Sequence, residues 1–248
     1  MTTPNFFTAP GNPDEKIWRY MDFPRYVSLI TRGSLYFSRA DLLGDPFEGS
    51  YPVINKESRD QLADQLLSEM PKDKVPADWK SNFLKQFSDT YRGMSKSIYV
   101  NCWHMNQFQS AAMWSIYSKD NKGIAIQSNY KALCDLLPNN FHVGVVNYID
   151  FNSAYLPETN IFVPFVHKRI SYQHEQELRA VTMRIDHEAF ARGEWPGNQT
   201  EGFYLPVDIK RLIDAIYIAP YAEKWYEELV VDVTKNWGLE KFKLSDPL

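Results

Sequence analysis

The stretch IWRYMDFPRYVSLITRGSLYFS, from Ile17 to Ser38, contains the pattern from which the fold is predicted. IWRYM at 17–21 and SLYFS at 34–38 are short β-rich runs, and Pro24 between them fits the first turn of a helix. Gly33 is expected to end that helix, because glycine readily adopts the left-handed conformation that closes many helices. The rest of the chain continues to alternate strands and helices without a regular repeat, which predicts an α+β fold.

The remaining predicted elements extend this alternation. Strands are predicted at 97–103, 122–127, 142–149, 177–185 and 215–219, helices at 109–118, 130–137 and 222–237, and a polar loop at 193–202. Residues 57–70 and 77–92 both show helical spacing of apolar side chains and are joined by a short polar linker. We therefore predict a proline-containing arm at 1–16 and one α+β domain with a central sheet at 17–248. The helical pair at 57–92 is predicted as an insertion on one side of it.

The charge of the chain limits its partners. Among 248 residues, 27 are Lys or Arg and 31 are Asp or Glu, so the net charge is −4. Proteins that coat nucleic acid through phosphate contacts usually carry a basic surplus, so broad nucleic-acid coating is not expected. The first residues lack the pattern of a signal peptide, and no apolar run reaches the ~18 residues of a membrane helix. We expect a cytoplasmic protein without a membrane partner.

Several common catalytic motifs are absent. The chain has no G-x-x-x-x-G-K-[ST] phosphate loop, no G-x-G-x-x-G after a strand and no G-x-S-x-G nucleophile turn. Cys102 and Cys134 fit neither a zinc motif nor a disulfide framework. Cys102 and His104 share one side of a predicted strand, but a zinc site needs three or four ligands and no others stand at suitable spacing. No metal is therefore expected.

The first candidate cluster is the run YQHEQELR, from Tyr172 to Arg179. Glu175 and Glu177, two residues apart at the start of a strand, point to one face of it, with Arg179 beyond them. Carboxylates in this position can orient a sugar hydroxyl or stabilise a developing oxocarbenium ion. The alternative is a solvated strand end with a Glu–Arg pair.

The second candidate cluster lies on the first two predicted strands, at Arg19 and Tyr20 on one and Tyr36 and Ser38 on the other. An arginine on a strand can hold a phosphate or carboxylate by two hydrogen bonds, and a serine on the neighbouring strand can position the same group. The alternative is that Arg19 lies on the surface and Tyr36 belongs to the core.

The third candidate cluster combines His104 with Trp114 and Tyr117, which fall on one helical face. Aromatic side chains at helical spacing either belong to the core or form a wall against which a flat ring stacks. Polar residues precede the helix and favour a lined pocket. The turn-rich run DPFEG at 45–49 adds two carboxylates that can reach the same pocket, or it is a plain turn.

The order of these motifs resembles a bacterial family, domain-of-unknown-function family 2971. The motifs that carry the resemblance are WRY at 18–20, GSLYFS at 33–38, DPFEG at 45–49, MWSIY at 113–117, KGIAI at 122–126 and SYQHEQELR at 171–179. The last is similar to a Y-x-x-E-x-R ending with one extra residue before its second glutamate. The resemblance spans about residues 17–220. It implies a bacterial or phage-related protein, and related AbiGi-type abortive-infection proteins imply phage defence.

The chain order also resembles, more distantly, the ADP-ribosyltransferase superfamily. That superfamily carries Arg or His on a first strand, Ser, Thr or Tyr on a second, and a late glutamate often written E-x-E. Arg19, Ser38 and the Glu175–Glu177 pair stand in those places in order, although Phe37-Ser38-Arg39 replaces the usual Ser-Thr-Ser. The resemblance implies a central split sheet with NAD bound in a cleft between its halves.

Two hypotheses follow about function. In the first, the protein transfers ADP-ribose from NAD to an unknown acceptor or hydrolyses NAD, without a metal. The binding residues of this hypothesis are Arg19 for the pyrophosphate or nicotinamide ribose, Ser38 for the ribose, Tyr36 or Trp114 for the nicotinamide ring, and Tyr20, Tyr117, His104 and Tyr172 for the rest of the pocket. Glu177 stabilises the cationic sugar and Glu175 activates the acceptor.

In the second hypothesis, the chain is a non-catalytic binding or sensor module of a bacterial defence system. Its aromatic pocket and helical pair then form a docking surface for a protein partner. A nuclease is disfavoured, because the sequence shows no acidic metal-ligand cluster beside a basic groove.

Overall fold

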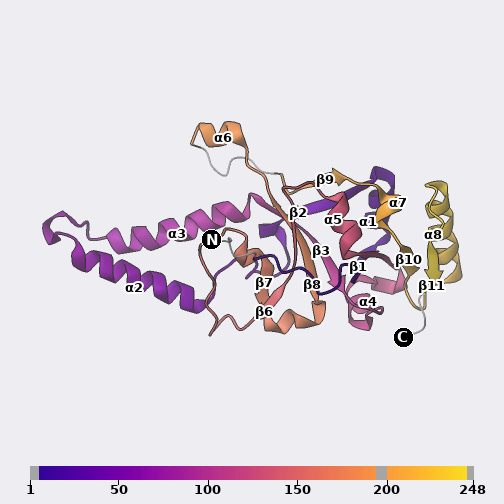
Figure 1. Ribbon diagram of the computed structural model, residues 1–248, viewed down its shortest axis with the longest axis horizontal. Helices are drawn as coiled ribbons and strands as arrows, with labels where there is room; N and C mark the ends of the chain where they lie inside the picture. The colour runs from indigo at the N-terminus through magenta and orange to yellow at the C-terminus, as the bar shows by residue number, and fades with distance from the viewer. Residues whose placement is uncertain (1–5, 194–199, 245–248) are drawn as a thin grey trace.

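A computed structural model describes residues 6–193 and 200–244, and shows one large sheet with helices on both faces (Figure 1). Its strands are β1 (Lys16–Asp22), β2 (Ser34–Arg39), β3 (Ile98–Met105), β4 (Gly123–Asn129), β5 (His142–Val145), β8 (Glu177–Met183), β9 (Gly202–Pro206), β10 (Ala215–Ile218) and β11 (Phe242–Leu244). A second, two-stranded sheet consists of β6 (Asn147–Ile149) and β7 (His167–Arg169). The helices are α1 (Phe23–Arg32), α2 (Val53–Glu69), α3 (Trp79–Ser95), α4 (Ala111–Tyr117), α5 (Tyr130–Leu136), α6 (His187–Ala191), α7 (Ile209–Leu212) and α8 (Lys224–Asn236). The predicted α+β class is confirmed.

The large sheet splits at β3. Along one edge, β3 pairs antiparallel with β8, from Ile98 opposite Met183 to His104 opposite Glu177. Its other edge is shared by two strands. β2 pairs near residues 99–100, and β1 pairs only at residues 104–105. Because β1 and β2 part between these contacts, the sheet divides into an arm β1-β4-β10-β11 and an arm β2-β9. This gap between β1 and β2, here called the split, confirms the expected split sheet.

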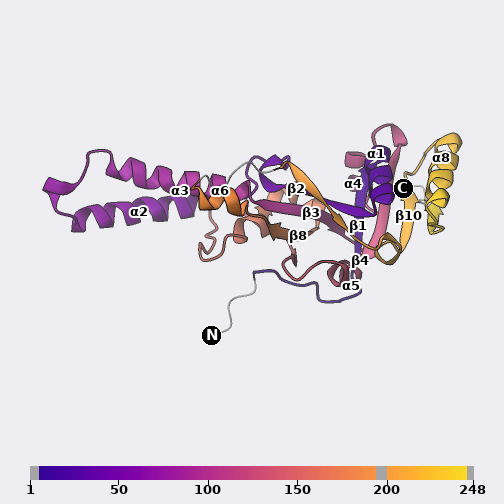
Figure 2. The ribbon, with the colours of Figure 1, turned by 90° about the horizontal axis from the view of Figure 1, so that it is seen from above.

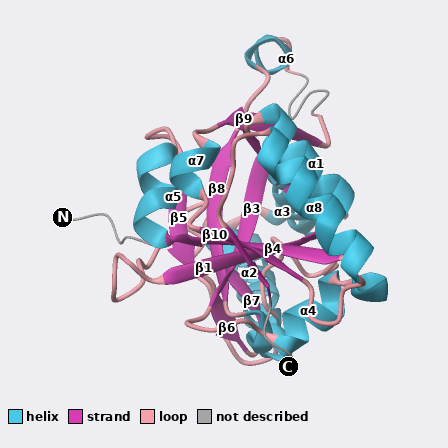
Figure 3. Cartoon of the chain, turned by 90° about the vertical axis from the view of Figure 1, so that its right-hand side faces the viewer, coloured by secondary structure: helices cyan, strands magenta, loops and turns pink. Residues whose placement is uncertain are grey.

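The main core lies on one face of the sheet, under α1, α5, α7 and α8 (Figure 3). Alternation along the strands supplies its apolar side chains, as at β4, where Ile124 and Ile126 enter this core and Ala125 packs on the opposite face. The helix α1 begins and ends as the sequence predicts. The Asp22 carboxylate accepts the Arg25 N–H at 2.8 Å, and Gly33 closes the helix at φ +56°.

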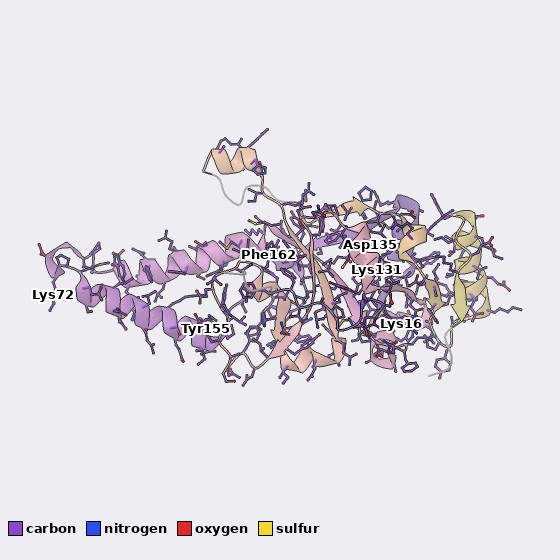
Figure 4. The ribbon with its side chains drawn as sticks, in the orientation of Figure 1. Lys16, Lys72, Lys131, Asp135, Tyr155 and Phe162 are labelled. Atoms are coloured by element: carbon purple, nitrogen blue, oxygen red, sulfur yellow. The ribbon has the colours of Figure 1, made fainter. Side chains whose placement is uncertain are left out.

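The helices α2 and α3 form an antiparallel pair that projects from the body (Figure 2). Lys72 stands at the far tip of this pair (Figure 4). At the base, the fully buried Asn55 holds the loop that follows β6: its amide donates to the Leu156 carbonyl at 2.7 Å, and its oxygen accepts the Leu156 N–H at 2.9 Å. The predicted inserted pair is confirmed, although α2 begins four residues earlier and α3 ends three residues later than predicted.

Two predicted segments differ from the structure. The strand expected at 142–149 is interrupted at Val146, whose N–H donates to the Glu177 carbonyl at 2.9 Å, and β6 then joins β7 in the small sheet. The loop expected at 193–202 gives way to β9 at Gly202, while 194–199 lie outside the described residues, as do 1–5 of the predicted arm. Within the described ranges, no helix combines the length and apolar character needed to span a membrane.

Candidate functional site

A cavity of about 870 Å³ opens at the split in the sheet. It is lined by residues of β1, β2, β3 and β8, together with the turn at 43–48 and the segment 168–175. All but one of the residues predicted for the site line it, namely Arg19, Tyr20, Tyr36, Ser38, His104, Tyr117, Tyr172, Glu175 and Glu177. Arg19 and the Glu175–Glu177 pair, which the sequence could not place together, therefore line one cavity. A neighbouring hollow of about 940 Å³ at the base of the α2–α3 pair contains none of these residues.

Trp114 is the predicted site residue that does not line the cavity. It is 3% exposed and packs edge-on against the Tyr20 ring, with 4.9 Å between ring centroids. Its indole N–H donates to the Gln109 side chain at 3.0 Å. Trp114 therefore supports Tyr20 from behind, and Tyr117, one turn further along α4, reaches the cavity in its place.

Strand register places four polar side chains on the floor of the cavity. Cys102 pairs opposite Arg179, and His104 pairs opposite Glu177. Directly paired residues share a face of the sheet, and residues two apart on a strand share it as well. All four side chains line the cavity.

Arg179 is the centre of a buried charge network and is only 1% exposed. Its guanidinium donates twice to Glu48, at 2.8 and 2.7 Å, and twice to one oxygen of Glu177, at 3.2 and 2.7 Å. The remaining N–H donates to the Phe165 carbonyl at 2.9 Å. All five N–H groups of the side chain are thus satisfied. The Glu–Arg pair considered in the sequence exists, but it is buried and not solvated.

Glu177 is held as a carboxylate by this network. Burial by itself raises the pKa of Glu177, but the charges of Arg179 and Lys168 outweigh it and leave the pKa below the ordinary value. Burial, followed by the negative charge of Glu177, raises the pKa of the Cys102 thiol well above its usual range. Glu177 is therefore ionised at neutral pH beside a thiol that stays protonated.

Lys168 lines the cavity and is the residue of the candidate site that the sequence analysis missed most clearly. Its ammonium is bound to Glu175 and lies 3.5 Å from both Glu177 and Glu48. The same ammonium lies over the Tyr172 ring, 4.6 Å from the ring centroid. It follows a buried 3-10 turn, VPFV at 163–166, on a strand of three residues. So short an element has no periodicity by which a sequence could reveal it.

Glu175 reaches the site by a route that the sequence did not predict. It ends a 3-10 turn, and the next residue, Gln176, is left-handed at φ +41° before β8 begins at Glu177. The two glutamates therefore do not stand on one strand. Their carboxylates meet because both contact Lys168. A left-handed residue other than glycine is uncommon and costs conformational energy, and here it turns the chain between the two glutamates.

The turn at 45–49 lines the cavity with Asp45 and Glu48. Of its two interpretations from the sequence, a plain turn or a source of carboxylates for the pocket, the structure supports the second. Asp45 accepts the Phe47 N–H at 3.0 Å and pairs with Arg169 at 2.8 Å, while Glu48 pairs with Arg179. Gly49 makes this geometry accessible, since its φ is +67° and an added Cβ would come within 2.4 Å of the Phe165 ring.

Arg19 has a different environment from the other cations of the site. Its guanidinium lies 6.0 Å from the centroid of the Trp103 ring, and its Nη1 is shielded from solvent without a hydrogen-bond partner. Burial lowers the pKa of Arg19, and the side chain forms none of the ion pairs seen among the described residues. A guanidinium nitrogen shielded from water without a counter-charge is costly, so it is typical of a site that binds an anion.

The outer end of the cavity is aromatic. Tyr36 on β2 and Tyr204 on β9 lie 5.0 Å apart between ring centroids and are 37% and 43% exposed. The Arg32 guanidinium covers the Tyr204 ring at 4.4 Å. Ser38, two residues beyond Tyr36, pairs with Val100 and lines the same cavity. Tyr204 was not predicted, because the β9 segment follows a polar loop and is only five residues long.

Comparisons with known proteins give little further information. No protein-family model matches the chain, and no curated protein matches its sequence. Among solved structures, it is similar to a chain titled "Thermus sp. 2.9 DarT in complex with ADP-ribosylated ssDNA", with 12% sequence identity and a TM-score of 0.40, covering 96% of this chain and 95% of that chain. Similarity at this level assigns neither fold nor function. Within the described residues, no group of three or more His, Cys, Asp or Glu side chains is arranged to hold a metal ion.

Proposed function

We propose that the cavity at the split binds NAD and that the protein is an ADP-ribosyltransferase-like enzyme. The observation that carries this proposal is that one cavity is lined both by Arg19, a cation without an ion pair whose Nη1 is buried and unbonded, and by Glu177, a buried carboxylate held ionised. The volume of about 870 Å³ falls in the range of pockets that enclose small-molecule ligands and cofactors. The aromatic pair Tyr36 and Tyr204 offers a flat ring a surface to stack on.

The residues divide the chemistry between binding and charge stabilisation. Arg19 pairs with the negatively charged diphosphate, because it is the cation of the cavity without a counter-charge. Glu177 accepts a hydrogen bond from a ribose hydroxyl. It stabilises the cationic sugar as the bond between ribose C1′ and the pyridinium nitrogen breaks and its electron pair moves to the ring. Its lowered pKa makes Glu177 a poor proton acceptor and a suitable fixed negative charge.

Glu175 is the residue proposed to activate the acceptor. Its side chain is 22% exposed and touches Lys168, whereas Glu177 is enclosed by two cations. The acceptor forms its bond to C1′ and gives its proton to Glu175 as nicotinamide leaves. The place of the chain in family 2971, and with it a role in phage defence, is part of the same proposal and rests on the sequence resemblance.

The test is release of nicotinamide from NAD by the pure protein. We expect release by the wild type, strong loss in Arg19→Gln and Glu177→Gln, and unchanged release in Lys131→Gln, whose side chain pairs with Asp135 on α5, outside the cavity. Glu177→Gln also weakens the contacts of Arg179 and Lys168, so it is judged only at temperatures where its melting curve shows it folded. A wild type that releases no nicotinamide would contradict the enzyme proposal.

One observation favours the second candidate function, a non-catalytic module. One carboxylate oxygen of Glu177 already accepts a hydrogen bond from Arg179 and lies 3.5 Å from the Lys168 ammonium. Such contacts are expected of an ion pair that stabilises the fold. In that case the projecting α2–α3 pair is the docking surface for a protein partner (Figure 2). A folded wild type that neither binds nor cleaves NAD, together with partner capture that requires α2 and α3, would favour this function.

A further inference from the structure

The two ring nitrogens of His104 have different surroundings, and this fixes the proton on the ring. Nδ1 lies 2.6 Å from the backbone carbonyl oxygen of Glu175. A carbonyl only accepts hydrogen bonds, so Nδ1 carries the hydrogen. Burial lowers the pKa of His104, so the ring is neutral at neutral pH. The other nitrogen, Nε2, therefore presents a lone pair and can only accept a hydrogen bond.

This acceptor has no partner in the part of the chain that the structure describes. His104 is 2% exposed, and Nε2 is shielded from solvent and without a hydrogen bond. Buried polar atoms are almost always hydrogen-bonded, so an orphaned acceptor in the wall of a cavity indicates a ligand that donates to it.

The position of His104 indicates which part of the ligand it meets. It stands directly opposite Glu177 on the neighbouring strand, on the same face of the sheet. Under the proposed function Glu177 takes the ribose hydroxyl, so the ring attached to that ribose lies beside His104. The Tyr20 ring borders the same place, edge-on to His104 with 6.0 Å between ring centroids. The hydrogen-bond donor on a nicotinamide ring is its carboxamide NH₂.

We propose that Nε2 of His104 accepts a hydrogen bond from the nicotinamide carboxamide and thereby selects NAD over its carboxylate analogue. This inference rests on the proposed function and adds a specificity-determining residue to it. In nicotinic acid adenine dinucleotide a carboxylate replaces the amide. Two acceptors would then face each other in a buried place, and neither would gain a hydrogen bond.

The experiment compares binding of the two dinucleotides by isothermal titration calorimetry, which does not depend on turnover. For the wild type we expect the carboxylate analogue to bind about tenfold or more weakly than NAD. His104→Asn keeps an N–H that can reach the Glu175 carbonyl and removes the acceptor at Nε2. His104→Asn should weaken the binding of NAD and reduce the preference for NAD over the carboxylate analogue to about twofold or less.

His167 is the matched control. Its Nδ1 lies 2.7 Å from the Val163 carbonyl, and burial lowers its pKa as well, but it does not line the cavity. His167→Asn should therefore keep the wild-type preference. Equal binding of the two dinucleotides by the wild type would overturn the inference and leave the proposed function standing, whereas absence of NAD binding would overturn both. If His104→Asn does not fold, the relative affinity of the wild type for NAD and for the carboxylate analogue still tests the inference.

Discussion

Replacing Arg179 with methionine is expected to destabilise the fold more than loss of any surface cation. The guanidinium is 1% exposed and uses all its N–H groups on Glu48, Glu177 and the Phe165 carbonyl. Methionine fills a similar volume but leaves the buried carboxylates of Glu48 and Glu177 with Lys168, 3.5 Å from each, as their remaining ion-pair partner among the described residues. Breaking a buried ion pair by removing one partner costs about 3–5 kcal/mol in unfolding free energy.

That cost can be measured by urea denaturation or thermal melting. For a chain of this size about 1 kcal/mol shifts the melting temperature by about 2–4 °C, so Arg179→Met should melt about 6–20 °C lower. The control is Arg25→Met, because the Arg25 side chain is 71% exposed and its pair with Asp22 spans 3.5 Å. Exposed pairs of this kind contribute about 1 kcal/mol or less.

A double variant tests the reasoning further. In Glu48→Gln/Arg179→Met, one of the two stranded carboxylates is neutralised together with the cation. The combined loss should be smaller than the sum of the single losses by about 1 kcal/mol or more, because the residues are in direct contact. An Arg179→Met protein within about 1 kcal/mol of the wild type, or strictly additive losses, would refute this account of the network.

Three further predictions concern backbone, pH and the unpaired cation. Gly49→Ala should lower the free energy of unfolding by about 2–4 kcal/mol, because alanine is strained at this positive φ and its Cβ clashes with Phe165. Gly11→Ala, where the added Cβ meets open space, should leave the free energy of unfolding unchanged. Burial lowers the pKa of His104 and His167 below 6.5, so the unfolded chain binds protons first as the pH falls. Stability measured by melting should be full above about pH 6.5 and decline below it, with a shallower decline in His167→Asn. Arg19→Met should leave the melting temperature of the ligand-free protein unchanged or higher, because the guanidinium has no ion pair to lose and methionine can still pack on Trp103; a marked fall would show that Arg19 is structural.

Local signals in the sequence were enough to predict most of the strands and helices that build the site. Pro24 and Gly33 mark the ends of α1 because their backbone preferences are intrinsic to the residues. Alternation along β3 put Cys102 and His104 on one face, and the structure confirms it. Arg19 and Ser38 fall on the strands where the sequence placed them.

What the sequence could not reveal depends on tertiary contacts. Lys168 joins the site through a three-residue strand, and Glu175 through a left-handed Gln176, and neither leaves a periodic signal. Trp114 and Tyr117 share a helical face, but only the packing of α4 decides which of them reaches the cavity. The unpaired state of Arg19 is likewise a property of its surroundings.

Direct binding of NAD by the wild type and Arg19→Gln, measured by calorimetric titration, tests the central claim most directly. We predict that the wild type binds NAD and that Arg19→Gln binds it roughly tenfold to a hundredfold more weakly, since a charge-assisted contact is lost while the fold is retained. The claim is contradicted if the wild type shows no binding at millimolar NAD, or if the two proteins bind it equally.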